Sequence, residues 1–490
     1  MIWEAVQQRA LTQPNSLAFI DADGAYSYAE LVEKTQSVAQ SLSQYAGQVM
    51  GLYAGNSISW LLVDFACQIN KIILVPLPAF FSNQQLVHAI ETAGVDVLIH
   101  SDNDRLCDLV DCLNGSILTA NLISSSLAKP THSQKPKQTA KITFTSGSTG
   151  RPKGVCLSNQ QQFNVADAIQ QSLHLTAGKH LSVLPFSTLL ENTAGAYVTL
   201  LNGGCVVALP SEKLGFNGSS QFDIAVFFEV LAEQQPVSLI ILAELLMAIV
   251  HKVEMGWKLP TSIEMIAIGG SKVPSRLLEQ ADALGLPVFE GYGLSECGSV
   301  VSLNTPGQRL IGSVGKPLKH VAVQINNDEV LVSGNSFLGY VNESTSWGQR
   351  LVETGDLGYV DEHGFLYING RKKNLLISSF ARNISPEWVE SSVLSDPNIN
   401  QCVIFGDQRP YCIALVWTQN KQFKKADIDT SLSVANQTLP DYAKVKAWIR
   451  LPVPLSYGSG TLTANGKPMR INIAQQYAEQ INTLYMEHQE

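Results

Sequence analysis

A ten-residue stretch rich in glycine and hydroxyl side chains has the composition of an anion-binding loop. It follows a short apolar strand candidate, Lys141 to Phe144, and consists of Thr145, Ser146, Gly147, Ser148, Thr149, Gly150, Arg151, Pro152, Lys153 and Gly154. Glycine lets the backbone turn tightly, and hydroxyls and exposed N–H groups can surround an anion. Arg151 and Lys153 add positive charge, so the loop suits a triphosphate. It is not a Walker A loop, because the pattern G-x-x-x-x-G-K-[ST] does not occur.

Four more motifs follow this loop in order along the chain. They are Glu290-Gly291-Tyr292-Gly293-Leu294-Ser295-Glu296, Thr354-Gly355-Asp356, Gly370-Arg371-Lys372-Lys373-Asn374 and Leu462-Thr463-Ala464-Asn465-Gly466-Lys467. Together with the loop they resemble the motifs of the adenylate-forming family, which includes acyl-CoA synthetases, nonribosomal peptide adenylation domains and luciferases. The resemblance covers nearly the whole chain. It implies that the protein uses ATP and Mg²⁺ to convert a carboxylic acid into an acyl-AMP, with release of pyrophosphate.

The segment Glu290 to Glu296 is expected to hold adenine, phosphate and metal. Tyr292 offers a flat aromatic face for a purine, and Gly291 and Gly293 leave room for its approach. Glu296 is a hard oxygen ligand suited to Mg²⁺, and Ser295 can donate its hydroxyl to the α-phosphate. Outside the motif, a core tyrosine and a surface carboxylate would explain the same residues.

The resemblance places the ribose between the segment Thr354 to Asp356 and the segment Gly370 to Asn374. Asp356 can accept hydrogen bonds from both ribose hydroxyls, while Arg371 donates to the ribose. Thr354-Gly355-Asp356 alone also fits a plain turn, and the same holds for the glycine pair at 269–270. The other expected ATP or AMP contacts are Thr145 (also a catalytic candidate), Ser146, Gly147, Ser148, Thr149, Gly150, Lys153 and Gly270.

The catalytic lysine implied by the resemblance is Lys467. A cation brought to the α-phosphate would stabilise the negative charge that develops as the carboxylate attacks. The C-terminal domain is then expected to swing about the hinge residue Lys373, which withdraws Lys467 and admits a thiol.

The acyl pocket is expected around two further segments. Phe186, Thr188 and Glu191 lie in Leu184 to Glu191, where fatty-acyl members often have a histidine at the position of Thr188. Gly269 and Ser271 belong to a loop that lines the adenine and acyl pockets in the family. No acid that would pair with a substrate ammonium is evident, so an apolar acyl chain such as a fatty acid is favoured over an amino acid.

The thiol acceptor leaves no compact motif in the sequence. The first hypothesis is transfer to coenzyme A, which would make the protein a fatty-acyl-type CoA synthetase. The second is transfer to the phosphopantetheine arm of an acyl carrier protein. The third is a binding module without turnover, which the joint presence of Glu296, Asp356, Arg371 and Lys467 disfavours.

The elements that position these residues alternate between helix and strand. Helical spacing runs from Tyr28 to Tyr45, and strands are expected at Val49 to Tyr53, Val95 to His100 and Lys141 to Phe144. Ser238 to Val250 fits a buried helix or a strand–helix unit. Ser124 to Gln138 has the composition of a solvated connector. Strands separated by helices indicate a mostly parallel sheet covered on both faces.

The organisation changes after about Asn304. Short strands separated by turns are expected there, including Val321 to Ile325 and Glu329 to Ser333. They suggest a small antiparallel or barrel-like subdomain. The expected fold is α/β, with a large N-terminal domain and a small mobile α+β C-terminal domain. The expected boundaries are residues 1–370 for the adenylation core, 371–374 for the hinge and 375–490 for the lid that carries the lysine.

Bulk composition excludes several other classes of protein. The net charge is −9 with no run of basic residues, which disfavours a nucleic-acid partner. The eight scattered cysteines form no C-x-x-C pair, as expected of reduced thiols in the cytoplasm. Neither a secretory signal nor a transmembrane segment is expected from the sequence.

Overall fold

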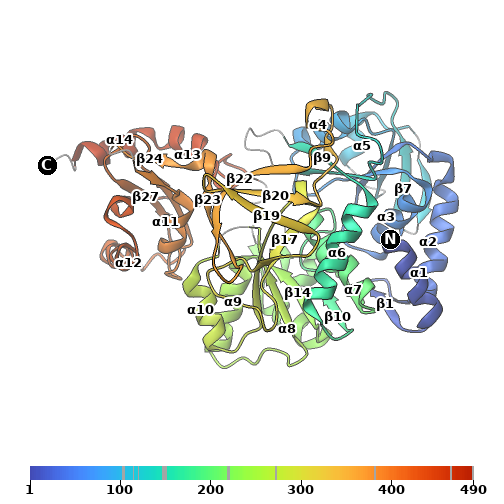
Figure 1. Cartoon of the computed structure of the whole chain (residues 1–490), viewed down its shortest axis with the longest axis horizontal. Helices are drawn as coiled ribbons and strands as arrows, with labels where there is room; N and C mark the ends of the chain where they lie inside the picture. Colours follow the sequence, from blue (N-terminus) through green and yellow to red (C-terminus); the bar gives the residue numbers. More distant parts are fainter. Residues whose placement is uncertain are drawn as a thin grey trace.

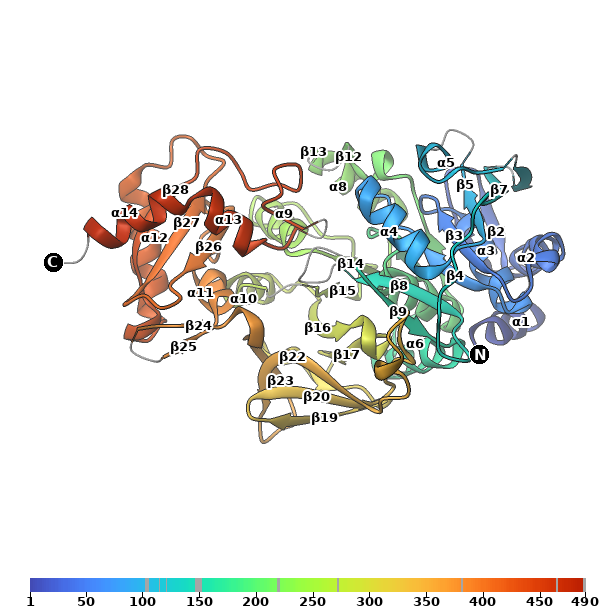
Figure 2. The ribbon, with the colours of Figure 1, turned by 90° about the horizontal axis from the view of Figure 1, so that it is seen from above.

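The computed structural model describes the chain except residues 102–104, 114, 120, 146–151, 218–220, 271–272, 380–381, 464–465 and 488–490. Two large sheets and their helices make up the N-terminal part, followed by a four-stranded sheet and a C-terminal α/β module. Figures 1 and 2 place this module at the opposite end of the molecule from α1 and α2. None of the described helices is long and apolar enough to cross a membrane.

The first large sheet has the strand order β21-β9-β8-β4-β3-β5-β7-β6. Strand β3 pairs in parallel with β4 and β5, and β8 pairs in parallel with β4 and antiparallel with β9. The glycine-rich loop therefore joins two neighbouring strands. The strands are β3 (Val49–Tyr53), β4 (Ile73–Pro76), β5 (Val97–His100), β6 (Ser116–Thr119), β7 (Leu122–Ser126), β8 (Lys141–Thr145), β9 (Lys153–Leu157) and β21 (Gly339–Tyr340).

The second large sheet has the order β18-β17-β16-β15-β14-β10-β11-β1-β2 and is parallel from β1 through β16. Its strands are β1 (Leu17–Ile20), β2 (Ala25–Ser27), β10 (Lys179–Leu181), β11 (Cys205–Val207), β14 (Ser238–Ile241), β15 (Met265–Ile268), β16 (Val288–Leu294), β17 (Ser299–Leu303) and β18 (Lys316–Pro317). Strands β12 (Phe216–Asn217) and β13 (Gln221–Phe222) form a separate hairpin.

Helices fill the space between the two sheets and cover their outer faces. One apolar cluster joins Trp60 of α3, Ile169 of α6 and Tyr197 of the π-helix η2 to Leu52 of β3 and Phe19 of β1. Burial of such large side chains is the main stabilising contribution of this layer. The helices are α1 (Ile2–Thr12), α2 (Tyr28–Leu42), α3 (Ile58–Asn70), α4 (Asn83–Ala93), α5 (Arg105–Val110), α6 (Asn159–Leu173), η2 (Glu191–Tyr197), α7 (Val198–Leu201), α8 (Ile224–Gln234), α9 (Ala243–Glu254) and α10 (Ser275–Ala283).

The four-stranded antiparallel sheet connects the two large sheets to the C-terminal module. Its strands are β19 (Val321–Asn326), β20 (Glu329–Gly334), β22 (Leu351–Val360) and β23 (Leu366–Arg371). The module beyond it has its own apolar clusters. It contains β24 (Leu376–Ile377), β25 (Asn383–Ile384), α11 (Pro386–Val393), β26 (Gln401–Phe405), β27 (Cys412–Trp417), α12 (Lys425–Gln437), β28 (Val445–Arg450), α13 (Arg470–Gln476) and α14 (Ala478–Glu487).

Most of the expected elements are confirmed. The strands predicted at 49–53, 95–100 and 141–144 correspond to β3, β5 and β8, and Ser238 to Val250 is a strand followed by a helix. Helix α2 begins at Tyr28, where Ser27 and Glu30 form a capping box. The connector prediction is wrong at its start, because residues 124–126 belong to β7 and Ser124 and Ser125 are buried against β5.

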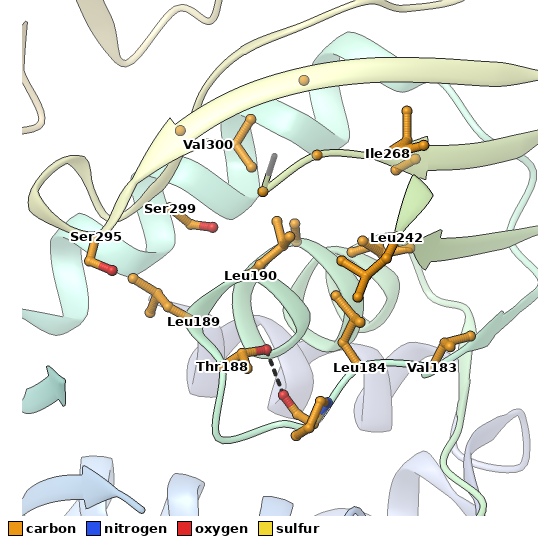
Figure 3. A pocket seen from close by; sticks show the side chains of 18 of the residues that line it. Val183, Leu184, Thr188, Leu189, Leu190, Leu242, Ile268, Ser295, Ser299 and Val300 are labelled. Atoms are coloured by element: carbon orange, nitrogen blue, oxygen red, sulfur yellow. Dashed lines mark hydrogen bonds between the residues drawn. The ribbon is translucent and has the colours of Figure 1, made fainter. Parts of the chain in front are cut away.

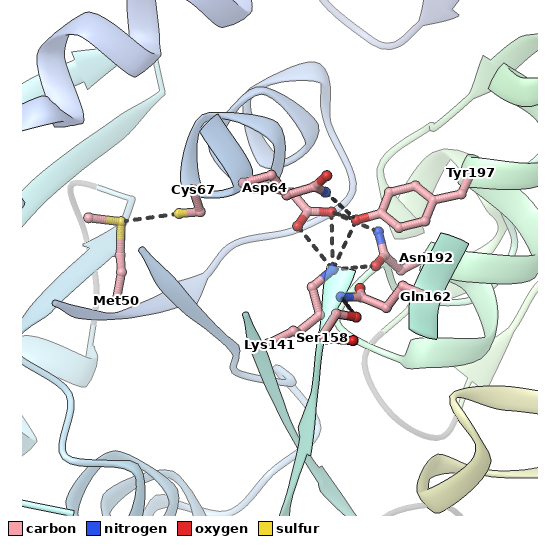
Figure 4. A network of polar contacts seen from close by, with 9 residues as sticks. Met50, Asp64, Cys67, Lys141, Ser158, Gln162, Asn192 and Tyr197 are labelled. Atoms are coloured by element: carbon pink, nitrogen blue, oxygen red, sulfur yellow. Dashed lines mark hydrogen bonds and ion pairs between the residues drawn. The ribbon is translucent and has the colours of Figure 1, made fainter. Parts of the chain in front are cut away.

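A buried polar network joins three elements at the centre of the N-terminal part (Figure 4). The Nζ atom of Lys141 lies 2.9 Å from Oδ1 of Asp64 on α3, and both side chains are almost fully buried. Lys141 also donates to Oδ1 of Asn192 at 2.6 Å, and the hydroxyl of Tyr197 donates to Oδ2 of Asp64 at 2.6 Å. The network therefore ties η2 to the first residue of β8, the strand that leads into the glycine-rich loop.

Candidate active site

A cavity of about 1520 Å³ collects most of the residues expected to carry the chemistry. Its walls include residues that directly follow strands β14 and β15, the edge at which open α/β sheets bind ligands. The C-terminal module contributes Gly466, Lys467 and Pro468. The expected site residues among its lining are Thr145, Lys153, Thr188, Gly269, Gly270, Gly291, Tyr292, Gly293, Ser295, Glu296, Arg371, Lys373 and Lys467.

Some predicted site residues lie outside the described residues. They are Ser146, Gly147, Ser148, Thr149 and Gly150 of the phosphate loop, and Ser271 of the acyl loop. The two described ends of the phosphate loop, Thr145 and Lys153, face each other as partners in the β8–β9 hairpin.

Asp356 is held between Arg371 and Tyr292. The antiparallel register of β22 and β23 sets Asp356 opposite Arg371, whose Nε lies 2.6 Å from Oδ1 of Asp356. The hydroxyl of Tyr292 donates to Oδ2 at 2.6 Å. Burial raises the pKa of Asp356, and the positive charge of Arg371 opposes that effect. The carboxylate is buried behind these two side chains, which themselves line the cavity.

Lys467 enters the cavity from a tight turn in the C-terminal module. The backbone N–H of Thr463 donates to the carbonyl of Lys467, and Gly466 adopts a φ of 72°, which favours glycine. Lys467 is exposed to solvent, yet it lines the cavity together with Arg371 and Lys373. Partial desolvation there, reinforced by the nearby charge of Arg371, lowers the pKa of Lys467. With Lys373 and Arg371 it forms a cationic group suited to phosphates.

A tyrosine that the sequence did not single out connects Glu296 and Lys153. The hydroxyl of Tyr340 donates to Oε1 of Glu296 at 2.8 Å. The ammonium of Lys153 lies 4.6 Å from the centre of the Tyr340 ring and 3.1 Å from Oε2 of Glu343. Tyr340 follows Gly339 in β21, far along the chain from both partners, so no local spacing pointed to it.

The apolar arm of the cavity lies between η2 and the second large sheet. Figure 3 shows Leu190, Leu242 and Val300 around this space. Thr188 also lines it, but its hydroxyl donates to the carbonyl of Pro185 at 2.7 Å. Thr188 therefore satisfies its own polar group and leaves the arm apolar.

Two of the residues expected in the acyl pocket do not line the cavity. Phe186 is buried in the core, where its ring contacts those of Trp60 and Phe19. Glu191 is fully buried behind the wall, with Oε1 2.9 Å from Nε2 of His180. The prediction is corrected for both residues. Phe186 precedes η2 and packs into the core with its backbone N–H bonded to Oδ1 of Asn56, while η2 turns Glu191 toward His180. The cavity wall is formed instead by Leu189, Leu190, Ala194 and His180.

This site suits a magnesium ion that takes nucleotide phosphate oxygens among its ligands. Among the described residues, no group of three or more His, Cys, Asp or Glu side chains could hold a metal by itself. A single carboxylate such as Glu296 is what Mg²⁺ uses when phosphate oxygens and water supply its other ligands.

The model of the AMP-binding enzyme family matches residues 6–336, and that of the AMP-binding enzyme C-terminal domain matches residues 373–489. The chain belongs to the AMP-binding enzymes. The resemblance to the adenylate-forming family is thereby confirmed, and membership makes the protein an ATP-dependent, AMP-forming acid ligase.

Individual relatives of this AMP-binding enzyme are distant. The chain is 25% identical to a long-chain-fatty-acid–CoA ligase, FadD15 of Mycobacterium bovis, over 91% of this chain and 89% of the relative. It is also 25% identical to 2-succinylbenzoate–CoA ligase of Bacillus subtilis, over 82% and 84%. The structure of O-succinylbenzoate coenzyme A synthetase from Bacillus subtilis with ATP and magnesium superposes with a TM-score of 0.78 at 23% identity, covering 95% and 98% of the two chains. This likeness confirms the α/β fold with a large N-terminal part and a small C-terminal module.

Proposed function

We propose that this AMP-binding enzyme activates a long-chain fatty acid with Mg·ATP and transfers the acyl group to coenzyme A. The observation that carries the proposal is one cavity with two different ends. Lys467, Arg371 and Lys373 gather at one end, and an apolar arm extends from the other. A cationic end suits phosphates, and an apolar arm suits methylene groups.

The lining of the arm favours a fatty acid over succinylbenzoate, the acid named for one of the relatives. Succinylbenzoate carries a second carboxylate, which would need a cation or several donors when buried. In the described part of the lining, every Lys and Arg lies at the nucleotide end, and His180 is already paired with Glu191. A hydrocarbon chain leaves no such group unpaired.

In the first step a carboxylate oxygen of the acid attacks the α-phosphorus of ATP. The new P–O bond forms as the bond to the β-phosphate oxygen breaks, which gives acyl-AMP and pyrophosphate. Lys467 would stabilise the charge that develops on the α-phosphate, and Arg371 with Tyr292 would hold the nucleoside beside Asp356. Mg²⁺ bound through Glu296 would neutralise charge on the departing pyrophosphate.

In the second step the thiol of coenzyme A attacks the acyl carbon, and AMP leaves. We propose that residues 375–490 turn about the hinge 371–374, centred on Lys373, relative to the core 1–370. This rotation would withdraw Lys467 and open a path for the thiol. Coenzyme A is favoured over a carrier protein because the relatives named above are CoA ligases.

Pyrophosphate release and product mass test the proposal directly. The enzyme would be incubated with Mg·ATP and acids from acetate to long-chain and aromatic acids, with and without coenzyme A. Long-chain acyl-CoA as the preferred product is the expected result. Acyl-AMP that accumulates despite coenzyme A would favour a carrier protein as acceptor. Preference for an aromatic or short acid would refute the fatty-acid assignment.

A further inference from the structure

The segment from Phe337 to Glu343 contacts both charged groups expected to handle the phosphates and their metal. The backbone N–H of Phe337 donates to the carbonyl of Glu296, and the Tyr340 hydroxyl donates to its carboxylate. On the other side, Lys153 lies over the Tyr340 ring and pairs with Glu343. Lys153, Glu296 and Tyr340 all line the cavity.

Opposite charges in one cavity have a tendency to pair with each other. If Lys153 and Glu296 formed an ion pair, the cation would be lost to the phosphates and the carboxylate to the metal. Instead Lys153 pairs with Glu343, and Tyr340 lies between Lys153 and Glu296. The ring of Tyr340 faces the ammonium of Lys153, and its hydroxyl donates to the carboxylate of Glu296. Cation–π contacts and hydrogen bonds to a carboxylate are each strong enough to fix such positions.

We propose that Tyr340 is a positioning residue for adenylation: it orients Glu296 toward Mg²⁺ and keeps Lys153 away from that carboxylate. The inference rests on the nucleotide-binding part of the proposed function and on the assignment of Glu296 to the metal. It does not depend on which acid or thiol the enzyme uses.

The local structure holds Tyr340 firmly in this place. Its backbone N–H donates to the hydroxyl of Ser346, its carbonyl accepts from the indole of Trp347, and its ring packs 4.8 Å from that of Phe337. Gly339 precedes it with a φ of 135°, and a Cβ there would lie 2.4 Å from a ring atom of Trp347. The hydroxyl can therefore be removed by Tyr340→Phe while the ring keeps its packing.

Nucleotide binding by the whole enzyme, measured by calorimetry without acid or coenzyme A, tests the proposal. Tyr340→Phe should weaken binding of Mg·ATP about tenfold, because Glu296 loses the donor that orients it. Binding of AMP in the presence of EDTA should change less than about twofold. Glu343→Gln should instead tighten ATP binding slightly and equally with and without Mg²⁺, because Lys153 is released toward the phosphates.

The matched control is Tyr359→Phe, since Tyr359 stacks on Tyr367 at the surface of the four-stranded sheet. It should leave both affinities unchanged. In the background of Glu296→Gln, Tyr340→Phe should cause no further loss of Mg·ATP affinity.

Three results would overturn the proposal. They are equal weakening of AMP and Mg·ATP, unchanged Mg·ATP affinity in Tyr340→Phe, or additive losses in the double variant. Because no acid is present, an enzyme that binds Mg·ATP but rejects fatty acids would refute the proposed substrate and leave this test intact.

Discussion

The guanidinium of Arg371 and the carboxylate of Asp356 form an ion pair 2.6 Å long between strands β22 and β23. Asp356 is buried while Arg371 is partly exposed, so the arginine covers the acid on the cavity side. Tyr292 engages the second carboxylate oxygen. The three side chains are fixed against one another, and we propose that they form one wall of the nucleoside site.

Asp356→Asn should weaken AMP binding at least about tenfold. The amide is neutral and can accept fewer hydrogen bonds, so Arg371 and Tyr292 lose the partner that orients them. Calorimetric titration with AMP measures the effect, and Glu362→Gln, at an exposed position in the turn between β22 and β23, serves as the control. Retention of wild-type AMP affinity would contradict the role given to Asp356.

Lys467→Ala should lower acid-dependent pyrophosphate release by about 100-fold or more, a typical loss when a preorganised charge is removed from a transition state. Thiolysis of a supplied acyl-adenylate should survive, because the proposed rotation withdraws the lysine before the second step. Lys421→Ala, at an exposed position of the C-terminal module, is the control. Equal loss of both half-reactions would rule out the assigned role.

The rate of adenylation should fall on the alkaline side at a lower pH than free lysine would predict. In its proposed role Lys467 acts as a cation, and because its pKa is lowered from the ordinary value of 10.5 it loses its proton earlier as the pH rises. A pH–rate profile of pyrophosphate release measures this limb. The Lys467→Arg variant keeps its positive charge at alkaline pH. It should release pyrophosphate more slowly than the wild type, but its pH–rate profile should lack the alkaline fall. Persistence of the same alkaline fall in Lys467→Arg would assign it to another group.

Ala267→Leu should shift the preferred acid to a shorter chain. Ala267 lies on β15 and lines the apolar arm, so a larger side chain takes up space that methylene groups would fill. The ratio of kcat/KM between long-chain and medium-chain acids should fall about tenfold or more. Ala232→Leu on the exposed face of α8 should leave this ratio unchanged. An unaltered ratio in Ala267→Leu would mean that the acyl chain binds elsewhere.

Gly195→Ala should destabilise the fold by about 1–3 kcal/mol, as overpacking of a filled interior does. A Cβ at Gly195 would lie 2.6 Å from Nε2 of His180 and 2.7 Å from Oε1 of Glu191. Urea unfolding measures the loss. Gly55→Ala is the matched control, because its Cβ would meet nothing within 4 Å. Equal free energies of unfolding for the two variants would show that His180 and Glu191 can move apart to accept the new Cβ without destabilising the fold.

The strands and turns around this site could be predicted from the sequence. The side-chain contacts between segments far apart in the chain became visible only in the structure. Periodicity and turn composition located β3, β8 and the β19–β20 hairpin, because these signals lie within a few neighbouring residues. Nothing local marks Tyr340 as the partner of Glu296, or His180 as that of Glu191. The π-helix turns Glu191 away from the cavity, and a motif match alone does not reveal that rotation.

The buried pair of Lys141 and Asp64 limits how this sequence can diverge over evolution. Removing either charge alone leaves the other unpaired in the interior, a loss of about 3–5 kcal/mol. That is a large part of the roughly 5–15 kcal/mol that keeps a protein folded. Exchange of both for apolar residues of similar volume is often neutral. Substitutions at these two positions should therefore be inherited together, and aligned descendants should carry both charges or neither.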